Sequence, residues 1–409
     1  MLALPSTRRE FLRVSSAGIG LLAFSRFAPS FLVQSTLAAS PAAEKDRSIL
    51  VLVQLAGGND GLNTLIPFED PLYYKLRPTL GIPKTEALPV SALTALHPAC
   101  LPLQSLLKEG KLAVIQNVGY PNPNRSHFRS TDIWETGSDS DQVVPTGWIG
   151  RYLDNACAGT PVSNDPLAVH VSNEVPQAFL AQEQHTSFGL SPNQNGRRQG
   201  NVALLESLLQ TADVPLNDSV NFLKQTTMDA LVTEKRVEAV LNKYRPSAAY
   251  PANGFSTSLR SVAALISARV ATRVYFVSLS GFDTHANQAG AHQNLLKTLS
   301  EGLAAFQKDL EDHQLADQVL TMTFSEFGRR PMENESKGTD HGTAAPLFVM
   351  GSRVKAGVLG TAPILDLGRN QDLTFSTDFR QVYATVLNRW LECPAAKILG
   401  RDFSPLAFL

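Results

Sequence analysis

Continuous apolar runs alternate along the chain with stretches whose apolar positions recur every three or four residues. Runs typical of strands buried on both faces occur at 48–55, 112–118, 274–280, 318–324 and 347–350. Helical spacing is found at 100–108, 258–269, 291–312 and 378–391. Strands separated by helices of this length predict a mainly parallel sheet covered on both sides, which is an α/β fold of the three-layer α/β/α sandwich type.

The region at about 160–255 differs from the rest of the chain. Its stretches 201–210 and 216–244 have helical spacing, and Pro246 and Pro251 end that pattern. We expect a helical insertion in a main domain that runs over 45–409. The insertion is either a cap over the site or a structural elaboration without a part in catalysis.

The first 38 residues have the features of an export signal. Arg8 and Arg9 are followed by Phe11, Leu12 and Arg13, and then by a weakly apolar segment rich in Ala, Gly and Ser. This order is typical of a twin-arginine signal peptide, while a Sec signal or an amphipathic surface helix is the alternative. The pattern predicts a periplasmic or secreted protein that is carried by the twin-arginine export machinery.

The charge composition narrows the classes of partner. The chain of 409 residues has 36 Lys and Arg against 37 Asp and Glu, which gives a net charge of −1. It therefore lacks the basic footprint of a protein that binds nucleic acid. The mature chain has no apolar stretch of about 18 residues, so we expect no integral membrane span. Its three cysteines permit one disulfide at most.

Polar groups follow the predicted strands, and the carboxyl ends of parallel strands meet at one edge of a sheet. The candidate metal ligands at these places are Asp60, Asp283, His285, Glu326, Asp340 and His341. Asp283 and His285 are two residues apart and share one side of an extended segment. They form either a hydrogen-bonded loop pair or part of a site for one or two divalent ions. Mixed imidazole and carboxylate ligands favour Zn²⁺ or Mn²⁺ over Mg²⁺.

The other candidate ligands also have structural interpretations. Asp60 follows a glycine-rich turn and could cap a helix instead of binding metal. Glu326 follows an apolar strand and needs a partner there, which is either Arg329 or a metal. Asp340 and His341 point apart on an extended chain. They serve two different ions, or one of them binds the ion and is held by the other.

The segment after the second predicted strand offers catalytic residues. Ser126 precedes a predicted helix, where oriented N–H groups stabilise a bound anion, and a metal that lowers its pKa would make it a nucleophile. Arg125 and Arg129 flank Ser126 and could each hold a phosphate or sulfate through two N–H groups. The alternatives are a serine that caps the helix and two surface arginines.

Long motifs carry a resemblance over essentially the whole mature chain. They are LVQLAGGNDGLNTLIP (52–67), NRSHFRSTDIWETG (124–137), GWIGRYLD (147–154), GFDTHANQ (281–288) and TFSEFGRRPMENESKGTDHG (323–342). With the twin-arginine start, they resemble the bacterial domain-of-unknown-function family 1501, which is grouped with the alkaline phosphatase and sulfatase superfamily. The family has no settled reaction.

The resemblance implies an alkaline-phosphatase-like sandwich with one or two divalent metals and a nucleophile at a helix N-terminus. Carried over to this chain, it implies that Ser126 is the nucleophile and that Asp60 is the carboxylate after the first strand. Asp283 and His285 look like one metal pair, and His341 resembles the later metal-binding histidine.

This sequence departs from the superfamily pattern at two places. Asp283-x-His285 is shorter than the usual Asp-x-x-x-His, and the usual Asp-His pair after a strand is replaced by Glu326 or by the displaced Asp340-His341. The departures imply one metal instead of two, or a fold that has lost its activity. No Cys-x-Pro-x-Arg signature is present, which argues against a formylglycine sulfatase.

These observations favour an exported metal-dependent hydrolase that acts on phosphate, sulfate or related anionic esters. Its substrate would be a small anionic ester or a polysaccharide. The alternative is a non-catalytic envelope protein for binding or assembly that keeps the alkaline-phosphatase-like fold. A metal-free α/β-hydrolase is disfavoured, because the G-x-S-x-G nucleophile motif is absent.

Overall fold

The computed structural model describes residues 47–155, 165–172, 174–182, 187–190, 235–368 and 371–409. The predicted signal peptide at 1–38 and most of the predicted insertion lie outside the described residues. Within the range of the predicted insertion, residues 235–243 are helical, as the sequence pattern predicts for this part. Ala168–Val171 and Ser187–Gly189 of the same range are instead strands of the central sheet, so the prediction of a helical insertion is wrong for them. None of the helices in the described residues combines the length and the apolar character needed to cross a membrane.

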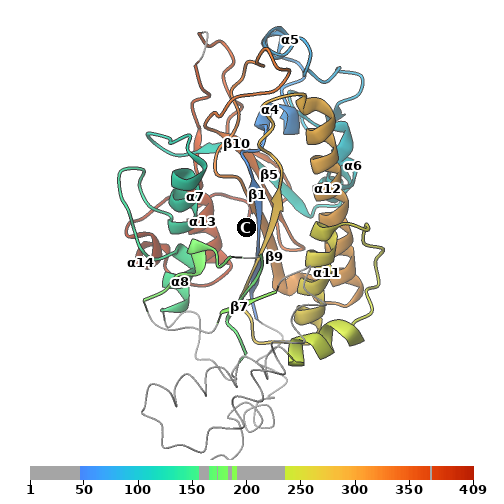
Figure 1. Cartoon of the computed structure of the whole chain (residues 1–409), viewed down its shortest axis with the longest axis vertical. Helices are drawn as coiled ribbons and strands as arrows, with labels where there is room; N and C mark the ends of the chain where they lie inside the picture. The colour runs from blue at the N-terminus through green and yellow to red at the C-terminus, as the bar shows by residue number, and fades with distance from the viewer. Residues whose placement is uncertain (1–46, 156–164, 173, 183–186, 191–234, 369–370) are drawn as a thin grey trace, which may run out of the picture.

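A nine-stranded sheet runs through the centre of the described residues (Figure 1). Its strands are β1 Ile49–Ala56, β5 Leu112–Gly119, β6 Ala168–Val171, β7 Ser187–Gly189, β8 Val274–Ser280, β9 Val319–Phe324, β10 Ala345–Met350, β11 Gly357–Leu359 and β12 Thr377–Asp378. Their order is β11-β5-β10-β9-β1-β8-β6-β7, with β12 beside β5. Strand β10 runs antiparallel to β9 and β5, and the other pairs are parallel. The predicted mainly parallel sheet is confirmed.

Helices cover both faces of this sheet (Figure 1). One face carries α7 His127–Thr136, α8 Trp148–Leu153, α13 Phe379–Arg389 and α14 Ala395–Leu399, and the other carries α6 Leu101–Lys108, α11 Gly254–Ser267 and α12 Gln288–Asp312. Leu50 and Leu52 of β1 belong to the core under α7 and α13, while Val51 and Val53 belong to the core under α11 and α12. The run 48–55 is apolar except at Ser48 and Gln54 because both faces of β1 are buried. The predicted three-layer sandwich is confirmed.

Short elements surround one end of the sheet. A three-stranded sheet of β2 Leu65–Ile66, β3 Leu88–Pro89 and β4 Ala95–Leu96 is accompanied by α4 Gly61–Thr64 and α5 Pro71–Leu76. Single 3₁₀ turns occur at η1 Pro98–Cys100, η3 Gln177–Phe179 and η4 Ala316–Gln318. Elements of two to six residues carry no readable apolar period, so the sequence did not predict them.

The loops that follow β1, β8 and β9 approach one another closely. These three strands are adjacent and parallel, so their carboxyl ends lie at the same edge of the sheet. Gly57 directly follows β1 with a φ of 119°, and a Cβ at this position would lie 2.4 Å from the backbone nitrogen of Asp283. Only glycine accommodates both the positive φ and this contact. The glycine-rich turn therefore lets the β1 and β8 loops meet.

Candidate metal centre

Three histidines and one aspartate meet beyond the ends of β1, β8 and β9. Asp283 and His285 come from the loop after β8, His341 comes from the loop before β10, and His127 is the first residue of α7. Asp283 Oδ1 lies 3.0 Å from His285 Nε2 and 3.1 Å from His341 Nε2. These two nitrogens are 2.9 Å apart, and His127 Nε2 lies 3.5 Å from Asp283 Oδ2. The four side chains therefore form one cluster.

The second ring nitrogen of each histidine faces an oxygen atom. His127 Nδ1 lies 2.8 Å from Glu326 Oε1, and His341 Nδ1 lies 2.9 Å from the backbone oxygen of Arg125. His285 Nδ1 lies 3.5 Å from a carboxylate oxygen. Because the oxygens at 2.8 and 2.9 Å accept hydrogen bonds, the neutral rings of His127 and His341 carry the proton on Nδ1 and present a lone pair at Nε2. Arg329 Nη1 lies 3.4 Å from His285 Nε2 and, as a donor, requires a lone pair on that nitrogen as well. Three lone pairs therefore face the carboxylate of Asp283, whose charge is partly offset by the guanidinium of Arg329 at 2.6 Å. A metal ion among the lone pairs would relieve the repulsion that remains.

This cluster has the donor set of a divalent metal centre. One ligand atom from each of His127, Asp283 and His341 lies within 4.8 Å of the other two. His127 Nε2 is buried and has no hydrogen-bond partner among the described residues. Imidazole nitrogens and a carboxylate oxygen are common zinc ligands, and metal-bound histidines usually donate their other N–H to an oxygen. The residues present therefore fit a divalent metal ion.

Arg329 connects the loops that carry the cluster. Its fully buried guanidinium donates to Asp283 Oδ1 at 2.6 Å, to the backbone oxygen of Gly58 at 2.7 Å and to that of Thr339 at 2.9 Å. Burial raises the pKa of Asp283, but the hydrogen bond and the positive charge of Arg329 outweigh it and lower the pKa to about 2. Asp283 is therefore a carboxylate at any physiological pH.

Glu326 lies behind His127 and not among the Nε2 atoms. Its side chain is 3% exposed, and its Oε1 accepts hydrogen bonds from the backbone of Gly57 at 2.8 Å and from His127 Nδ1 at 2.8 Å. The hydrogen bond to Glu326 raises the pKa of His127. Arg329 or a metal was the expected partner of Glu326. Among the described residues, His127 and Gly57 are instead the hydrogen-bond partners of Glu326 Oε1. Arg329 forms an ion pair with Asp283.

Asp340 lies behind His285 in a similar way. Its Oδ1 is 3.5 Å from His285 Nδ1 and accepts a hydrogen bond from Asn334 Nδ2 at 3.1 Å. This hydrogen bond from Asn334 lowers the pKa of Asp340. The structure thus brings His341 into the cluster through Nε2 and places Asp340 beside another histidine of the same cluster.

Asp60 lies outside the cluster in a buried network. Asp60 Oδ2 accepts a hydrogen bond from Arg77 Nη1 at 2.5 Å and another from Gln288 Nε2, and Asp60 Oδ1 caps α4 through the backbone of Asn63. Both side chains of the Asp60–Arg77 ion pair are 0% exposed. Burial raises the pKa of Asp60, but the charge of Arg77 outweighs it and lowers the pKa. The structure therefore shows the helix-capping alternative for Asp60.

Ser126 lies next to the cluster at the N-terminus of α7. It occupies the N-cap position, but its side chain makes no capping hydrogen bond. The residue is exposed and directly precedes His127. The backbone oxygen of the preceding residue, Arg125, contacts His341 Nδ1. The loop that carries Ser126 is thereby held against the cluster.

The two predicted catalytic arginines have different surroundings. The side chain of Arg125 is 46% exposed, and its Nη1 lies 3.4 Å from Asp372 Oδ2. Arg129 Nη2 donates to the backbone oxygens of Ser140, at 3.1 Å, and Gln142. Arg129 therefore holds the loop after α7 and is not brought to the cluster.

Sequence reasoning did not single out His127 or the role of Arg329. The signal for His127 was its position directly after Ser126, at the start of a helix whose N-terminus faces the sheet edge. Arg329 was considered only as a partner of Glu326. Its contacts with three separate loops depend on how those loops fold, which sequence spacing does not reveal.

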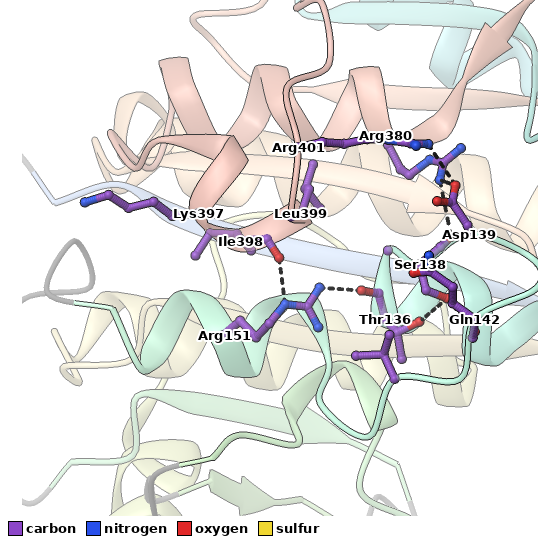
Figure 2. A pocket seen from close by; sticks show the side chains of 13 residues that line it. Thr136, Ser138, Asp139, Gln142, Arg151, Arg380, Lys397, Ile398, Leu399 and Arg401 are labelled. Atoms are coloured by element: carbon purple, nitrogen blue, oxygen red, sulfur yellow. Dashed lines mark hydrogen bonds and ion pairs between the residues drawn. The ribbon is translucent and has the colours of Figure 1, made fainter.

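A second polar region lies at the C-terminal end of α7 (Figure 2). It is a cavity of about 340 Å³ whose lining includes Arg151, Arg380, Arg401 and Asp139. Arg380 donates to both carboxylate oxygens of Asp378 and to Asp139, and Arg401 Nη2 donates to Asp139 at 2.8 Å. Arg151 donates to three backbone oxygens. The guanidinium groups of this cavity are thus paired within the protein.

Comparison with known proteins gives a family and distant structural likenesses. The family described as "Protein of unknown function (DUF1501)" matches residues 47–393, and no curated protein matches the chain. The chain is similar to a protein in the alkaline phosphatase superfamily from Vibrio parahaemolyticus, at 10% identity and a TM-score of 0.38, over 88% of this chain and 71% of that one.

Two further solved structures are similar at the same level. The PsFucS1 sulfatase from Pseudoalteromonas sp. has 11% identity and a TM-score of 0.37 over 97% of this chain and 72% of its own. The C-terminal periplasmic domain of EcEptC from Escherichia coli, in complex with Zn, has 12% identity and a TM-score of 0.36 over 76% and 74%. Likenesses at this level assign neither a reaction nor a metal to this chain.

Proposed function

The chain belongs to the DUF1501 family of proteins of unknown function, and on this premise we propose that it is an exported, metal-dependent hydrolase of phosphate, sulfate or related anionic esters. The observation that carries the proposal is the convergence of three Nε2 atoms on the carboxylate of Asp283. A divalent cation removes the repulsion among these atoms. The twin-arginine pattern at 1–38 supports export to the periplasm or beyond.

The ligands in this proposal are His127, Asp283, His285 and His341. Three imidazoles and one carboxylate favour a single Zn²⁺ or Mn²⁺ ion. Bound there, the ion supplies a Lewis acid for the ester oxygen and lowers the pKa of a hydroxyl or water beside it. Glu326 and Asp340 act on the far side of the rings, where they fix the orientation of two of the histidines.

For catalysis the proposal uses Arg125 and Ser126, which directly precede His127 along the chain. Ser126 offers an exposed hydroxyl that does not cap α7. The first N–H groups of α7 stabilise an anion that reaches this hydroxyl. Arg125 adds a positive charge on the solvent side, which offsets charge that develops on the anionic ester. Substrates of this site are small anionic esters or anionic polysaccharides.

The Asp283–Arg329 ion pair favours a second candidate function. At 2.6 Å, Arg329 already gives Asp283 a cationic partner that is itself completely buried. A protein that keeps this pair without a metal would be an envelope protein for binding or assembly, with the fold but without ester hydrolysis.

Metal content per chain tests the two functions. Elemental mass spectrometry is applied to the exported full-length protein, purified without chelator, and to its Asp283→Asn variant. We expect about one equivalent of zinc or manganese in the parent protein, since four ligands complete one zinc site, and its loss in Asp283→Asn. The control is Asp139→Asn, the same chemical change at an arginine-paired carboxylate of the cavity in Figure 2, which keeps the metal.

Hydrolysis of chromogenic phosphate and sulfate esters completes the test. Asp283→Asn and Ser126→Ala are each expected to lower the rate by about 100-fold or more, the order of loss when an essential transition-state contact is removed. Circular dichroism checks that the variants fold. Metal retained in Asp283→Asn contradicts the ligand assignment. A metal-loaded parent whose hydrolysis does not depend on Ser126 contradicts the role of that residue, and a parent without any hydrolysis favours the envelope binding protein.

A further inference from the structure

Two arginines and one aspartate form a charged group beside the metal centre. Arg125 Nη1 lies 3.4 Å from Asp372 Oδ2, and Arg330 Nε lies 3.4 Å from Asp372 Oδ1. Asp372 thus lies between the two guanidinium groups. We call these three residues the charge triad, and its net charge is positive because two cations face one carboxylate.

Contacts with the cluster fix the position of the charge triad. The backbone oxygen of Arg125 lies 2.9 Å from His341 Nδ1, and Arg330 directly follows Arg329. Thr343, two residues after His341, donates from its hydroxyl to the backbone oxygen of Leu373, next to Asp372. Arg125 and Arg330 are therefore held beside the metal centre, and Asp372 is tied to the segment that carries His341.

The contacts inside the charge triad are incomplete. Both ion-pair distances exceed the usual range of about 2.7–3.2 Å for an N–H···O hydrogen bond. Arg330 Nε and Asp372 Oδ1 are buried atoms without a hydrogen-bond partner among the described residues. By contrast, the neighbouring Arg329–Asp283 pair is fully formed at 2.6 Å. A buried N–H group without a partner costs free energy, so Arg330 gains from an anion that approaches more closely than Asp372 does.

We propose that Arg125 and Arg330 bind a second anionic group of the substrate and that Asp372 occupies this subsite until the substrate displaces it. The proposal rests on the proposed function, which places the reacting ester at the metal centre. A sulfate or phosphate group has several oxygens and accepts hydrogen bonds from both guanidinium groups at once. The substrate class is therefore an ester with at least one further negative charge, such as a saccharide that carries several sulfates or phosphates.

Anion binding to the full-length, zinc-loaded protein tests the subsite. Calorimetric titration with inorganic sulfate and with inorganic phosphate compares the parent protein with Asp372→Asn and Arg330→Gln. We expect Asp372→Asn to tighten binding and Arg330→Gln to weaken it, each by about tenfold, the order of one charge-assisted hydrogen bond. The anion with the larger gain in Asp372→Asn identifies the group that the substrate carries. Asp372→Ala is a second variant for the same site.

Asp366→Asn is the matched control. Asp366 is exposed in the segment that leads to Asp372, so the variant makes the same change in net charge without touching the arginines, and anion affinity should not change. If Asp372→Asn weakens binding or leaves it unchanged, Asp372 positions the arginines instead of occupying their site, and the proposal is overturned. If Arg330→Gln binds both anions as tightly as the parent, the anion binds elsewhere and the proposal is equally overturned.

Measurements on the parent protein distinguish a failure of this proposal from a failure of the proposed function. Its metal content and its hydrolysis of a simple monoester are measured on the same sample as the titration. If the parent holds metal and hydrolyses the ester while the anion affinities of the variants give one of the overturning results above, only the subsite is rejected and the proposed function stands. A parent without metal or hydrolysis rejects the proposed function, whatever the titrations show.

Discussion

The metal cluster at the N-terminal end of α7 and the cavity at its C-terminal end hold polar groups in opposite states. At its N-terminal end, His127 Nε2 is buried without a hydrogen-bond partner among the described residues, and it faces the carboxylate of Asp283. At its C-terminal end, Arg151 and Arg380 direct their N–H groups to backbone oxygens and carboxylates (Figure 2). Both ends contain arginines and carboxylates, so residue type alone does not distinguish them.

The completeness of hydrogen bonding is what separates the two regions. Buried polar groups in folded proteins almost always have partners, and the cavity in Figure 2 follows this rule. The cluster around Asp283 departs from it, as does the neighbouring charge triad. We infer that the first arrangement stabilises the fold, whereas the second is completed by a ligand.

The largest expected effect is a loss of stability at the C-terminal end. The side chain of Arg380 is 2% exposed and bridges Asp378 and Asp139. Arg380→Met leaves Asp378 without its cation, and breaking a buried ion pair in this way costs about 3–5 kcal/mol of the free energy of unfolding. Urea denaturation measures this loss, and metal content should not change.

Arg401→Met is the control for Arg380→Met. Arg401 contacts the same carboxylate, Asp139, but its side chain is 55% exposed, so the variant should cost less than about 1 kcal/mol. Loss of metal in a folded Arg380→Met protein would show that the two ends of α7 are not independent, which contradicts the comparison.

A pH-dependent effect on stability is expected from Glu135, near the C-terminal end of α7. Burial raises the pKa of Glu135 from 4.5 to about 7, and its Oε2 accepts a hydrogen bond from the backbone of Ala178 at 3.0 Å. Between these pH values the folded protein binds more protons than the unfolded chain. Stability from this group is therefore complete below about pH 4.5 and is lost as the pH rises through about 7.

Glu135→Gln isolates this effect because glutamine stays neutral and keeps an acceptor oxygen. Relative to the variant, the parent should lose on the order of 2–3 kcal/mol of unfolding free energy across this window, since one pKa unit is worth about 1.4 kcal/mol. Denaturant unfolding at a series of pH values measures the difference. A parallel pH dependence of parent and variant would mean that Glu135 is not the titrating group.

Sequence patterns predicted the fold and three of the four residues of the cluster for identifiable reasons. Strands buried on both faces, such as β1 and β8, are continuous apolar runs, and parallel strands bring their carboxyl ends to one edge. Asp283 and His285 follow β8 directly, so their meeting with residues of other loops could be expected. The antiparallel direction of β10 could not be predicted from the sequence, because a strand buried on both faces has the same apolar pattern in either direction.

The surroundings of Asp60 and His127 were not predictable from spacing. Asp60 pairs with Arg77, which lies 17 residues away at the end of a six-residue helix without a readable period. His127 reaches the cluster because α7 begins at that residue and its N-terminus faces the sheet edge. Both facts depend on long-range packing, which residue order alone does not encode.

The smallest expected effect is a loss of metal affinity on substitution of Glu326, at the N-terminal end of α7. Glu326 holds His127 through Nδ1, so the charge of Glu326 increases the basicity of the Nε2 lone pair. Glu326→Gln keeps the shape and an acceptor oxygen for the backbone N–H of Gly57 but removes this charge. Metal affinity should fall by about 10–100-fold, as for other residues that orient metal-bound histidines, while the free energy of unfolding of the metal-free protein changes little.

Competition with a chromogenic chelator measures this affinity, and Glu135→Gln serves as the matched control. Both variants replace a buried glutamate by glutamine, at residues 3% exposed for the Glu326 side chain and 5% for Glu135. Only Glu326 touches a histidine of the cluster. If both variants bind metal as tightly as the parent, His127 is not a ligand and the centre contracts to Asp283, His285 and His341. If both lose affinity equally, the two ends of α7 act as one unit and the completeness of hydrogen bonding does not separate them.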